Sequence, residues 1–331
     1  MRRMLAIALA VTSALAAGVS GLAYWALWQS LPPMPALTGE FQHTTLQHGG
    51  RTRSWRAYVP VARPKLPALV VVLHSSMGSA QQARAMFGYD FDVLADRHGF
   101  IVAYPNGVDG HWNEAKRKGP FSAKQQNVDD VGFLHALVDE LVESDSVDRS
   151  RVYVAGVSNG GSMVLRLALE TPEFARAYAA VVASIPTPEN MAAVQTRRAV
   201  SMLIMNGTKD PLNPWDGGEV VLRGVWGSRG MVMSTPASID YFRALAGLDA
   251  AADVTAFADR DSTDGSTVER SLWTAPGKPR VALYAIKGGG HDVPHPATYG
   301  RRLLGNSNRD IHAASEIWEF FHDSEYPAPG S

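Results

Sequence analysis

Apolar residues fall into two patterns that alternate along the chain. Residues 68–73, Ala-Leu-Val-Val-Val-Leu, form an apolar run without polar interruption. Such a run is typical of a central strand in a parallel sheet, because helices cover both of its faces. Further short apolar runs predict strands at residues 100–104, 151–155, 177–183, 201–205 and 281–286.

Between these runs, apolar residues recur at helical spacing. In residues 127–142 they share one helical face: Val128, Val131, Leu134, Leu137, Val138 and Leu141. We also expect helices over residues 80–98, after residue 158 and over residues 310–321, and an early alternating strand at residues 54–59. Strands that alternate with helices predict an α/β fold, a mostly parallel central sheet covered by helices on both faces.

Composition narrows the class of protein. The chain has 331 residues, of which 46% are hydrophobic and 19% charged, and its formal net charge is -1. This composition is typical of a globular protein with a large core and gives no general electrostatic basis for nucleic-acid binding. The chain has no cysteine, which excludes disulfides, thiol catalysis and thiolate metal sites.

The first 30 residues differ from the rest. Arg2 and Arg3 precede an apolar, uncharged run over residues 4–28. Residues 1–30 therefore predict either an export signal, with small residues at Ala14 and Ala16 for cleavage, or an uncleaved inner-membrane anchor. Residues 31–40 are rich in proline and predict a linker, and residues 41–331 predict one catalytic domain. Both alternatives predict an extracellular or periplasmic protein.

A candidate nucleophile stands at Gly156-Val157-Ser158-Asn159-Gly160, which fits the pattern G-x-S-x-G. A serine on a tight strand-to-helix turn needs neighbours without side chains, which explains the two glycines. The turn places the serine hydroxyl at the positive end of the following helix. Ser158 is therefore predicted to be a nucleophile.

A base and an acid are expected in the loops that follow later strands, because ligands collect at the carboxyl ends of parallel strands. Asp210 follows the run at 201–205, and His291 follows the run at 281–286. The order Ser158, Asp210, His291 is that of α/β-hydrolases, in which histidine takes the serine proton and the carboxylate orients the histidine. Alternatives remain open: Asp216 or Asp292 for the acid, and His295 or His312 for the base.

The oxyanion site requires main-chain donors. The backbone N–H of Asn159 follows the nucleophile, and the backbone N–H of Ser75 follows the early strand at 68–73, so these two are the candidates. Paired histidine spacing is absent from the sequence, so we expect neither a metal site nor a cofactor.

Several motifs together resemble the secreted polyhydroxybutyrate depolymerase and feruloyl esterase-like family of α/β-hydrolases. They are Val72-Leu73-His74, Ala95-Asp96-Arg97-His98-Gly99-Phe100, Tyr104-Pro105-Asn106-Gly107, Trp112-Asn113, Asn127-Val128-Asp129-Asp130-Val131-Gly132-Phe133, Val157-Ser158-Asn159-Gly160-Gly161, Asn206-Gly207-Thr208-Lys209-Asp210-Pro211 and Gly288-Gly289-Gly290-His291. The resemblance implies an α/β-hydrolase fold and a carboxylic-ester hydrolase whose triad is Ser158, Asp210 and His291.

The chain also departs from that family. Ser75 stands where the family usually has glycine, and Asp292-Val293-Pro294 stands where it often has a tryptophan-proline pair. We expect substrate contacts from His74, Trp112, Asn113 and Trp215, although a tryptophan also serves as core packing. The expected substrate is a small or polymeric ester: a hydroxyalkanoate, a hydroxycinnamoyl ester or an acetylated sugar. Acyl transfer and an inactive binding module on the same fold are the alternative functions.

Overall fold

The computed structural model describes residues 29–222, 227–298 and 300–324. The predicted signal or anchor over residues 4–28 lies outside the described residues. Among the helices that are described, none combines the length and the apolar character needed to cross a bilayer.

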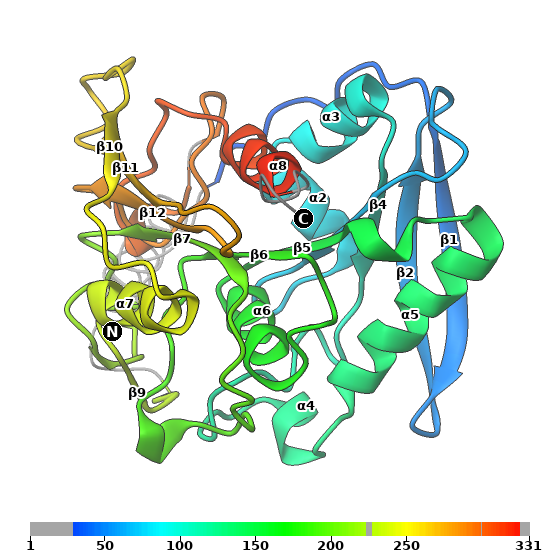
Figure 1. Ribbon diagram of the computed structural model, residues 1–331, viewed down its shortest axis with the longest axis horizontal. Coiled ribbons are helices and arrows are strands. Elements are labelled where there is room, and N and C mark those ends of the chain that lie inside the picture. Colours follow the sequence, from blue (N-terminus) through cyan, green and yellow to red (C-terminus); the bar gives the residue numbers. More distant parts are fainter. Residues whose placement is uncertain (1–28, 223–226, 299, 325–331) are drawn as a thin grey trace, which may run out of the picture.

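One ten-stranded sheet runs through the molecule (Figure 1). In spatial order its strands are β1 (Glu40–His48), β2 (Arg51–Val59), β4 (Ile101–Pro105), β3 (Leu69–Leu73), β5 (Val152–Val157), β6 (Ala177–Val181), β7 (Ser201–Gly207), β12 (Val281–Lys287), β11 (Thr267–Trp273) and β10 (Asp253–Ala256). The six strands from β4 to β12 are mutually parallel, and the strands outside them are antiparallel. The predicted α/β fold with a mostly parallel sheet is confirmed.

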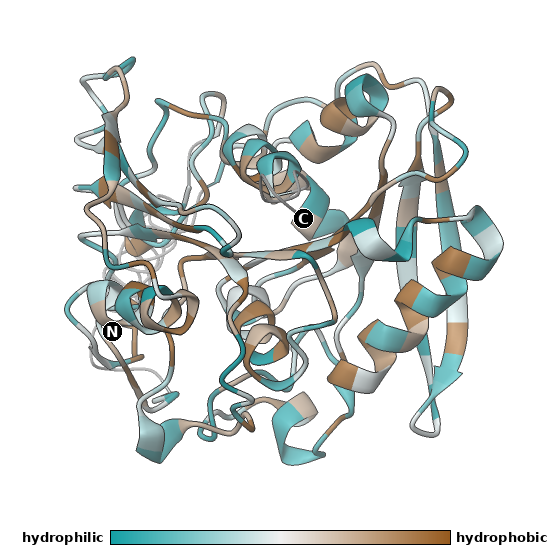
Figure 2. Ribbon diagram, in the orientation of Figure 1, coloured by the Kyte–Doolittle hydropathy of each residue, from teal (hydrophilic) through white to brown (hydrophobic). Residues whose placement is uncertain are grey.

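Helices cover both faces of this sheet, as its apolar strands require. They are α2 (Ala80–Met86), α3 (Asp90–His98), α4 (Ser122–Gln125), α5 (Asp130–Asp145), α6 (Asn159–Glu170), α7 (Thr235–Ala246) and α8 (Ala313–Asp323). One buried cluster joins the sheet to α5, α6 and α7, and another joins it to α2, α3 and α8. Figure 2 shows the strands in the middle of the sheet as mostly apolar and α5 as apolar along one side only.

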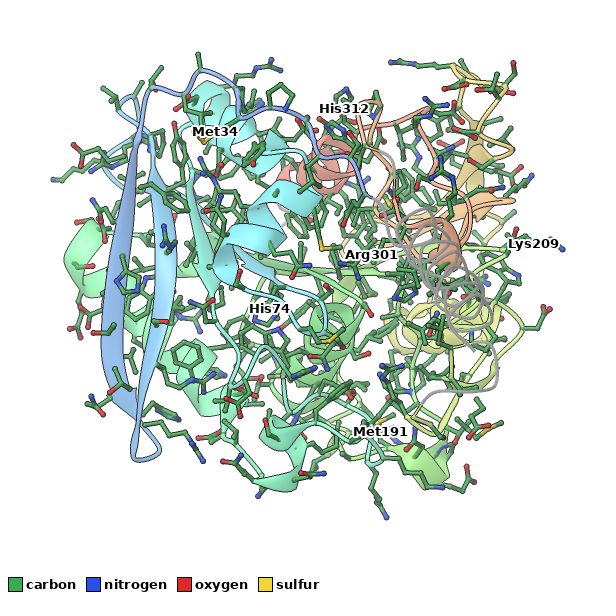
Figure 3. The ribbon with its side chains drawn as sticks, turned by 180° about the vertical axis from the view of Figure 1, so that it is seen from behind. Met34, His74, Met191, Lys209, Arg301 and His312 are labelled. Atoms are coloured by element: carbon green, nitrogen blue, oxygen red, sulfur yellow. The ribbon has the colours of Figure 1, made fainter. Side chains whose placement is uncertain are left out.

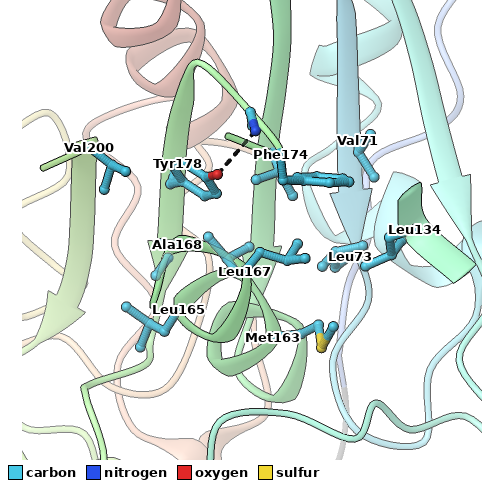
Figure 4. Packing of buried hydrophobic residues seen from close by; sticks show 14 of the residues in the cluster. Val71, Leu73, Leu134, Met163, Leu165, Leu167, Ala168, Phe174, Tyr178 and Val200 are labelled. Atoms are coloured by element: carbon cyan, nitrogen blue, oxygen red, sulfur yellow. Dashed lines mark hydrogen bonds between the residues drawn. The ribbon is translucent and has the colours of Figure 1, made fainter. Parts of the chain in front are cut away.

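The packing of α6 fixes the position of the turn that precedes it. Met163, Leu165 and Leu167 of this helix are fully buried (Figure 4). In the same buried cluster, the Tyr178 hydroxyl accepts the backbone N–H of Ala175 at 3.0 Å. Burying a large aliphatic side chain stabilises a protein by about 2 kcal/mol, so several kcal/mol hold α6 against the sheet.

Three expectations about the elements need correction. The single helix expected over residues 80–98 is two helices, because Gly88 and Tyr89 have φ values of +66° and +65° and break the helical hydrogen bonding. The antiparallel strands β1, β10 and β11 and the helix α7 were not expected. The predicted linker is tied to the domain, since the Thr38 hydroxyl donates to Asp96 at 2.7 Å and β1 already begins at Glu40.

Candidate active site

Ser158 stands on a strained turn between β5 and α6. Its φ is +55° and its ψ is −110°, outside the regions that most residues adopt. The neighbouring glycines are required by close contacts: a Cβ on Gly156 would lie 2.5 Å from the carbonyl oxygen of Gly160, and one on Gly160 would lie 2.4 Å from that of Leu73. The turn therefore presents a half-buried hydroxyl at the N-terminus of α6.

His291 and Asp210 reach this hydroxyl from neighbouring strands. The parallel strands β7 and β12 end at the same edge of the sheet, and the two residues follow them. His291 Nε2 lies 2.8 Å from Ser158 Oγ, and His291 Nδ1 lies 2.6 Å from Asp210 Oδ2. The structure thus joins the three predicted residues in one hydrogen-bonded chain.

The alternative acids and bases lie elsewhere. Asp216 is exposed, and Asp292 is half-buried with one oxygen that has no hydrogen-bond partner among the described residues. Burial raises the pKa of Asp292 against the opposing hydrogen bond from Ser307. His295 and His312 both contact Asp90, so neither faces Ser158.

Both candidate oxyanion donors lie beside the serine. In the register of the sheet Leu73 pairs with Gly156, which sets the residues after β3 against those after β5. Among the described residues, the backbone N–H groups of Ser75 and Asn159 have no hydrogen-bond partner. The Ser75 side chain is directed to α2, because its Oγ lies 3.6 Å from Met86 Sδ. The side chain of Ser75 is therefore not among those that line the cleft.

His74 fixes the loop that carries Ser75. The backbone N–H of Gly107 donates to His74 Nε2 at 2.9 Å, so Nδ1 carries the proton and donates to the Ser75 carbonyl oxygen at 2.8 Å. Burial lowers the pKa of His74 to about 4, which keeps the ring neutral. His74 lies in the interior of the molecule (Figure 3) and supports the loop that carries Ser75.

The expected substrate contacts of three residues are not supported, because none of these side chains lines the cleft. His74 and Trp112 are fully buried, and Asn113 is almost so. The Trp112 indole N–H donates to the His74 carbonyl oxygen at 3.1 Å, and the Asn113 backbone N–H donates to Asp130 at 2.7 Å. Trp215 is half-buried on the loop after Asp210, and its contact with substrate stays a prediction.

A narrow cleft opens at Ser158. Its walls also include Ser76, Glu114, Lys116, Phe121, Asn159, Ser162, Val182, Leu212, Asn213, Val220, Arg229 and His291. Glu114, Lys116 and Phe121 belong to the basic loop over residues 110–124, which therefore forms part of the cleft wall. The sequence analysis did not identify Arg229 as a cleft residue. Arg229 lies more than a hundred residues after Glu114, Lys116 and Phe121 in the chain, and no recognisable motif surrounds it.

One group among the described residues has the composition of a metal site. Asp90, His295 and His312 offer ligand atoms within 4.8 Å of one another. His295 Nδ1 accepts the backbone N–H of Ala297 at 3.1 Å, so Nε2 carries the ring proton and points it at Asp90, 3.3 Å away. A protonated nitrogen offers no lone pair to a cation. These contacts are therefore hydrogen bonds that hold the loop after His291 against α3.

A serine on a strained strand-to-helix turn, with a histidine and an aspartate following later parallel strands, defines the α/β-hydrolase class. Residues 54–212, nearly half of the chain, match the family described as "Esterase PHB depolymerase". Over these residues the chain is similar to polyhydroxybutyrate depolymerases and feruloyl esterases of the α/β-hydrolase fold.

Named relatives agree with this family. "Putative esterase NocK" of Nocardia uniformis subsp. tsuyamanensis is 36% identical over 51% of this chain, and "Poly(3-hydroxyalkanoate) depolymerase C" of Paucimonas lemoignei is 27% identical over 80% of it. The chain spans 48% and 65% of the lengths of these two relatives. An acetyl xylan esterase from Aspergillus awamori shares the fold, with a TM-score of 0.54 and 17% identity over 86% of this chain and 99% of that one.

Proposed function

We propose that the chain is a serine carboxylic-ester hydrolase that acts through an acyl-enzyme, with Ser158, His291 and Asp210 as its triad. The observation that carries this proposal is the continuous hydrogen-bonded chain from Asp210 through His291 to Ser158. The names of the relatives, which include a poly(3-hydroxyalkanoate) depolymerase, feruloyl esterases and acetylxylan esterases, support the same chemistry.

In the first half of the reaction, Ser158 Oγ bonds to the ester carbonyl carbon while His291 Nε2 takes the hydroxyl proton. The carbonyl oxygen becomes an oxyanion, and the backbone N–H groups of Ser75 and Asn159 donate to it. When the tetrahedral intermediate collapses, the ester C–O bond breaks and His291 returns the proton to the leaving alkoxide. The alcohol leaves, and the acyl group stays on Ser158.

In the second half, His291 takes a proton from water as the water oxygen bonds to the acyl carbon. The same donors stabilise the second oxyanion, and collapse releases the acid and returns the proton to Ser158 Oγ. Asp210 keeps the ring in the tautomer that has a free Nε2, because its Oδ2 accepts the Nδ1 proton.

The substrate class follows from the relatives rather than from the cleft. Their names point to hydroxyalkanoate esters, feruloyl esters and acetylated xylan. We also propose that residues 41–331 act as one catalytic unit and that residues 1–30 direct export, by a cleaved signal or by an anchor. Fractionation of cells that express the full chain, with the mass of the mature protein, separates these two forms of export.

A fluorophosphonate probe tests the nucleophile directly. We expect wild-type protein to be labelled and Ser158→Ala to be unlabelled, and both Ser158→Ala and His291→Ala to lose about 10⁴-fold or more in turnover of short-chain hydroxyalkanoate, feruloyl and acetyl esters. His295→Ala is the matched control and should keep its labelling. If folded wild-type protein fails to react with the probe, the chain is a binding module and the proposal is wrong. Products formed with an added alcohol separate hydrolysis from acyl transfer.

A further inference from the structure

Glu114, Lys116 and Arg229 line the cleft, and Lys124 lies beside Glu114. We call these four charged residues the basic end. Glu114 is fully buried and Lys116 is 5% exposed. Lys116 Nζ lies 3.2 Å from Glu114 Oε2, and Lys124 Nζ lies 3.8 Å from Glu114 Oε1. The basic end thus groups three cations around one carboxylate.

Three positive side chains and one negative side chain leave an excess of positive charge in the basic end, which is unfavourable unless an anion binds there. Burial lowers the pKa of Lys124 and of Arg229, and the carboxylate of Glu114 opposes both shifts only in part. A buried cation that lacks a counter-charge costs folding free energy, and proteins retain such groups mainly where they bind a ligand. An anionic ligand group would balance the charge of the basic end.

Arg229 has hydrogen-bonding capacity that the protein does not use. Its Nε and Nη1 atoms are buried and have no hydrogen-bond partner among the described residues. Its guanidinium lies 5.2 Å from the centre of the Phe121 ring. The backbone is held in place, since the Arg229 N–H donates to Val220 and its carbonyl oxygen accepts from Asn190, each at 3.0 Å. A planar guanidinium with free N–H groups suits a carboxylate.

The basic end lies close to the nucleophile. Lys116 Nζ donates to Ser162 Oγ at 2.6 Å, and Ser162 is one helical turn from Ser158, whose carbonyl oxygen accepts its N–H at 2.8 Å. Ser158, Lys116 and Arg229 also line the same cleft. An anion at the basic end is therefore a few covalent bonds from a carbonyl carbon attacked by Ser158. The free-acid end of a 3-hydroxyalkanoate oligomer has this spacing between its carboxylate and its last ester carbonyl.

We propose that Arg229 and Lys116 bind a carboxylate of the substrate, so that the preferred substrates are esters with a free carboxylate a few bonds from the scissile carbonyl. The inference rests on the proposed ester hydrolysis. It specifies in addition that the preferred ester carries a negative charge. The carboxylate can belong to the alcohol side or to the acyl side of the ester.

Two matched substrate pairs test the inference. On the alcohol side, 3-butanoyloxybutanoate is compared with its neutral primary amide, and on the acyl side, the 4-nitrophenyl monoester of glutaric acid is compared with its neutral primary amide. We expect kcat/KM of wild-type protein to favour the acid about tenfold or more in one pair. In Arg229→Gln and in Lys116→Gln that ratio should fall about tenfold, while Arg97→Gln, which removes an exposed arginine on α3, should keep it.

A ratio near one in both pairs, or a wild-type ratio in folded Arg229→Gln, overturns the inference while the esterase assignment stands. Binding is also measured without turnover, by calorimetry of Ser158→Ala protein with 3-butanoyloxybutanoate and its amide. The inference is supported if Ser158→Ala protein binds the acid more tightly than the amide, and if the double variant Ser158→Ala/Arg229→Gln no longer does so. Equal affinities for the acid and the amide of this pair, together with a kcat/KM ratio near one in the acyl-side pair, contradict it. Absence of Ser158-dependent turnover of all four esters would instead contradict the proposed function.

Discussion

Asp210 Oδ2 lies 2.6 Å from His291 Nδ1, while Asp210 Oδ1 accepts the backbone N–H groups of Leu212 and Asn213 at 2.7 and 2.8 Å. The two oxygens of one carboxylate therefore have different partners. Oδ1 is fixed by the loop, and Oδ2 remains to orient the imidazole. Because Oδ1 has two donors, this position requires an acceptor, and any replacement of the carboxylate has to place its oxygen there.

Asp210→Asn should therefore inactivate the enzyme, because it changes the tautomer of His291. The amide oxygen takes the place of Oδ1, so the NH₂ group faces Nδ1 and donates to it. Nε2 must then carry the proton and cannot accept the one from Ser158. We expect kcat to fall about 10³-fold or more with little loss of stability, measured by steady-state turnover and urea unfolding.

Asp216→Asn and Asp292→Asn serve as controls for this prediction. Asp216 is exposed and Asp292 is half-buried, and the ring nitrogens of His291 are hydrogen-bonded to Asp210 and Ser158 instead, so neither change should alter the tautomer. If Asp210→Asn keeps its turnover and Asp292→Asn loses it, the acid has been assigned to the wrong residue.

The sequence predicted those parts of the site that follow from strand order. Ser158, Asp210 and His291 each come just after an apolar run, and parallel strands end at a common edge, so their meeting could be expected. The direction of a side chain has no such signal: Trp112 follows a turn in a polar loop, yet its indole donates beneath the site to His74. Arg229 reaches the loop of Lys116 only through tertiary packing. The break at Tyr89 was missed because a left-handed backbone at a non-glycine residue depends on what packs against it.

Ser75→Ala should leave activity nearly unchanged. The donor proposed for the oxyanion is the main-chain N–H, and the side-chain hydroxyl contacts Met86 instead of the cleft. Removal of one weak hydrogen bond to sulfur costs at most about 1 kcal/mol. We expect kcat/KM within about threefold of wild type. A loss of a hundredfold or more would mean that the Ser75 hydroxyl itself contacts the reacting ester.

His74 should make the protein less stable in acid. An unfolded histidine titrates near pH 6.5, whereas burial lowers the pKa of His74 to about 4 in the folded protein. Between these values the unfolded chain binds more protons, so the free energy of unfolding falls as pH falls through this window. Two to three pH units at 1.36 kcal/mol each give a loss of about 3 kcal/mol from this residue.

His74→Gln removes this titration and retains one acceptor and one donor for Gly107 and Ser75. In urea unfolding, the stability lost between pH 7 and pH 4.5 should be about 2 kcal/mol smaller in this variant than in wild type. His43→Gln replaces an exposed histidine and should reproduce the wild-type loss. Identical losses in His74→Gln and wild type would show that His74 is already protonated in the folded protein.

Gly160→Ala should damage both stability and activity, although alanine favours a helix by about 1 kcal/mol over glycine. The added Cβ would lie 2.4 Å from the carbonyl oxygen of Leu73 and 2.5 Å from that of His74. Both are backbone atoms at the end of β3, so α6 and the loop of Ser75 have to move apart, and overpacking of this kind costs about 1–3 kcal/mol. The clash outweighs the helical preference, and the movement separates the two oxyanion donors.

Urea unfolding and the rate of fluorophosphonate labelling measure these two effects separately. Gly49→Ala is the control: its Cβ meets nothing within 4 Å, and its φ of +56° alone costs about 1 kcal/mol. Gly49→Ala should therefore lose some stability and keep its labelling rate, whereas Gly160→Ala should lose both. Wild-type stability together with a wild-type labelling rate in Gly160→Ala would mean that β3 and α6 do not meet as closely as this turn requires.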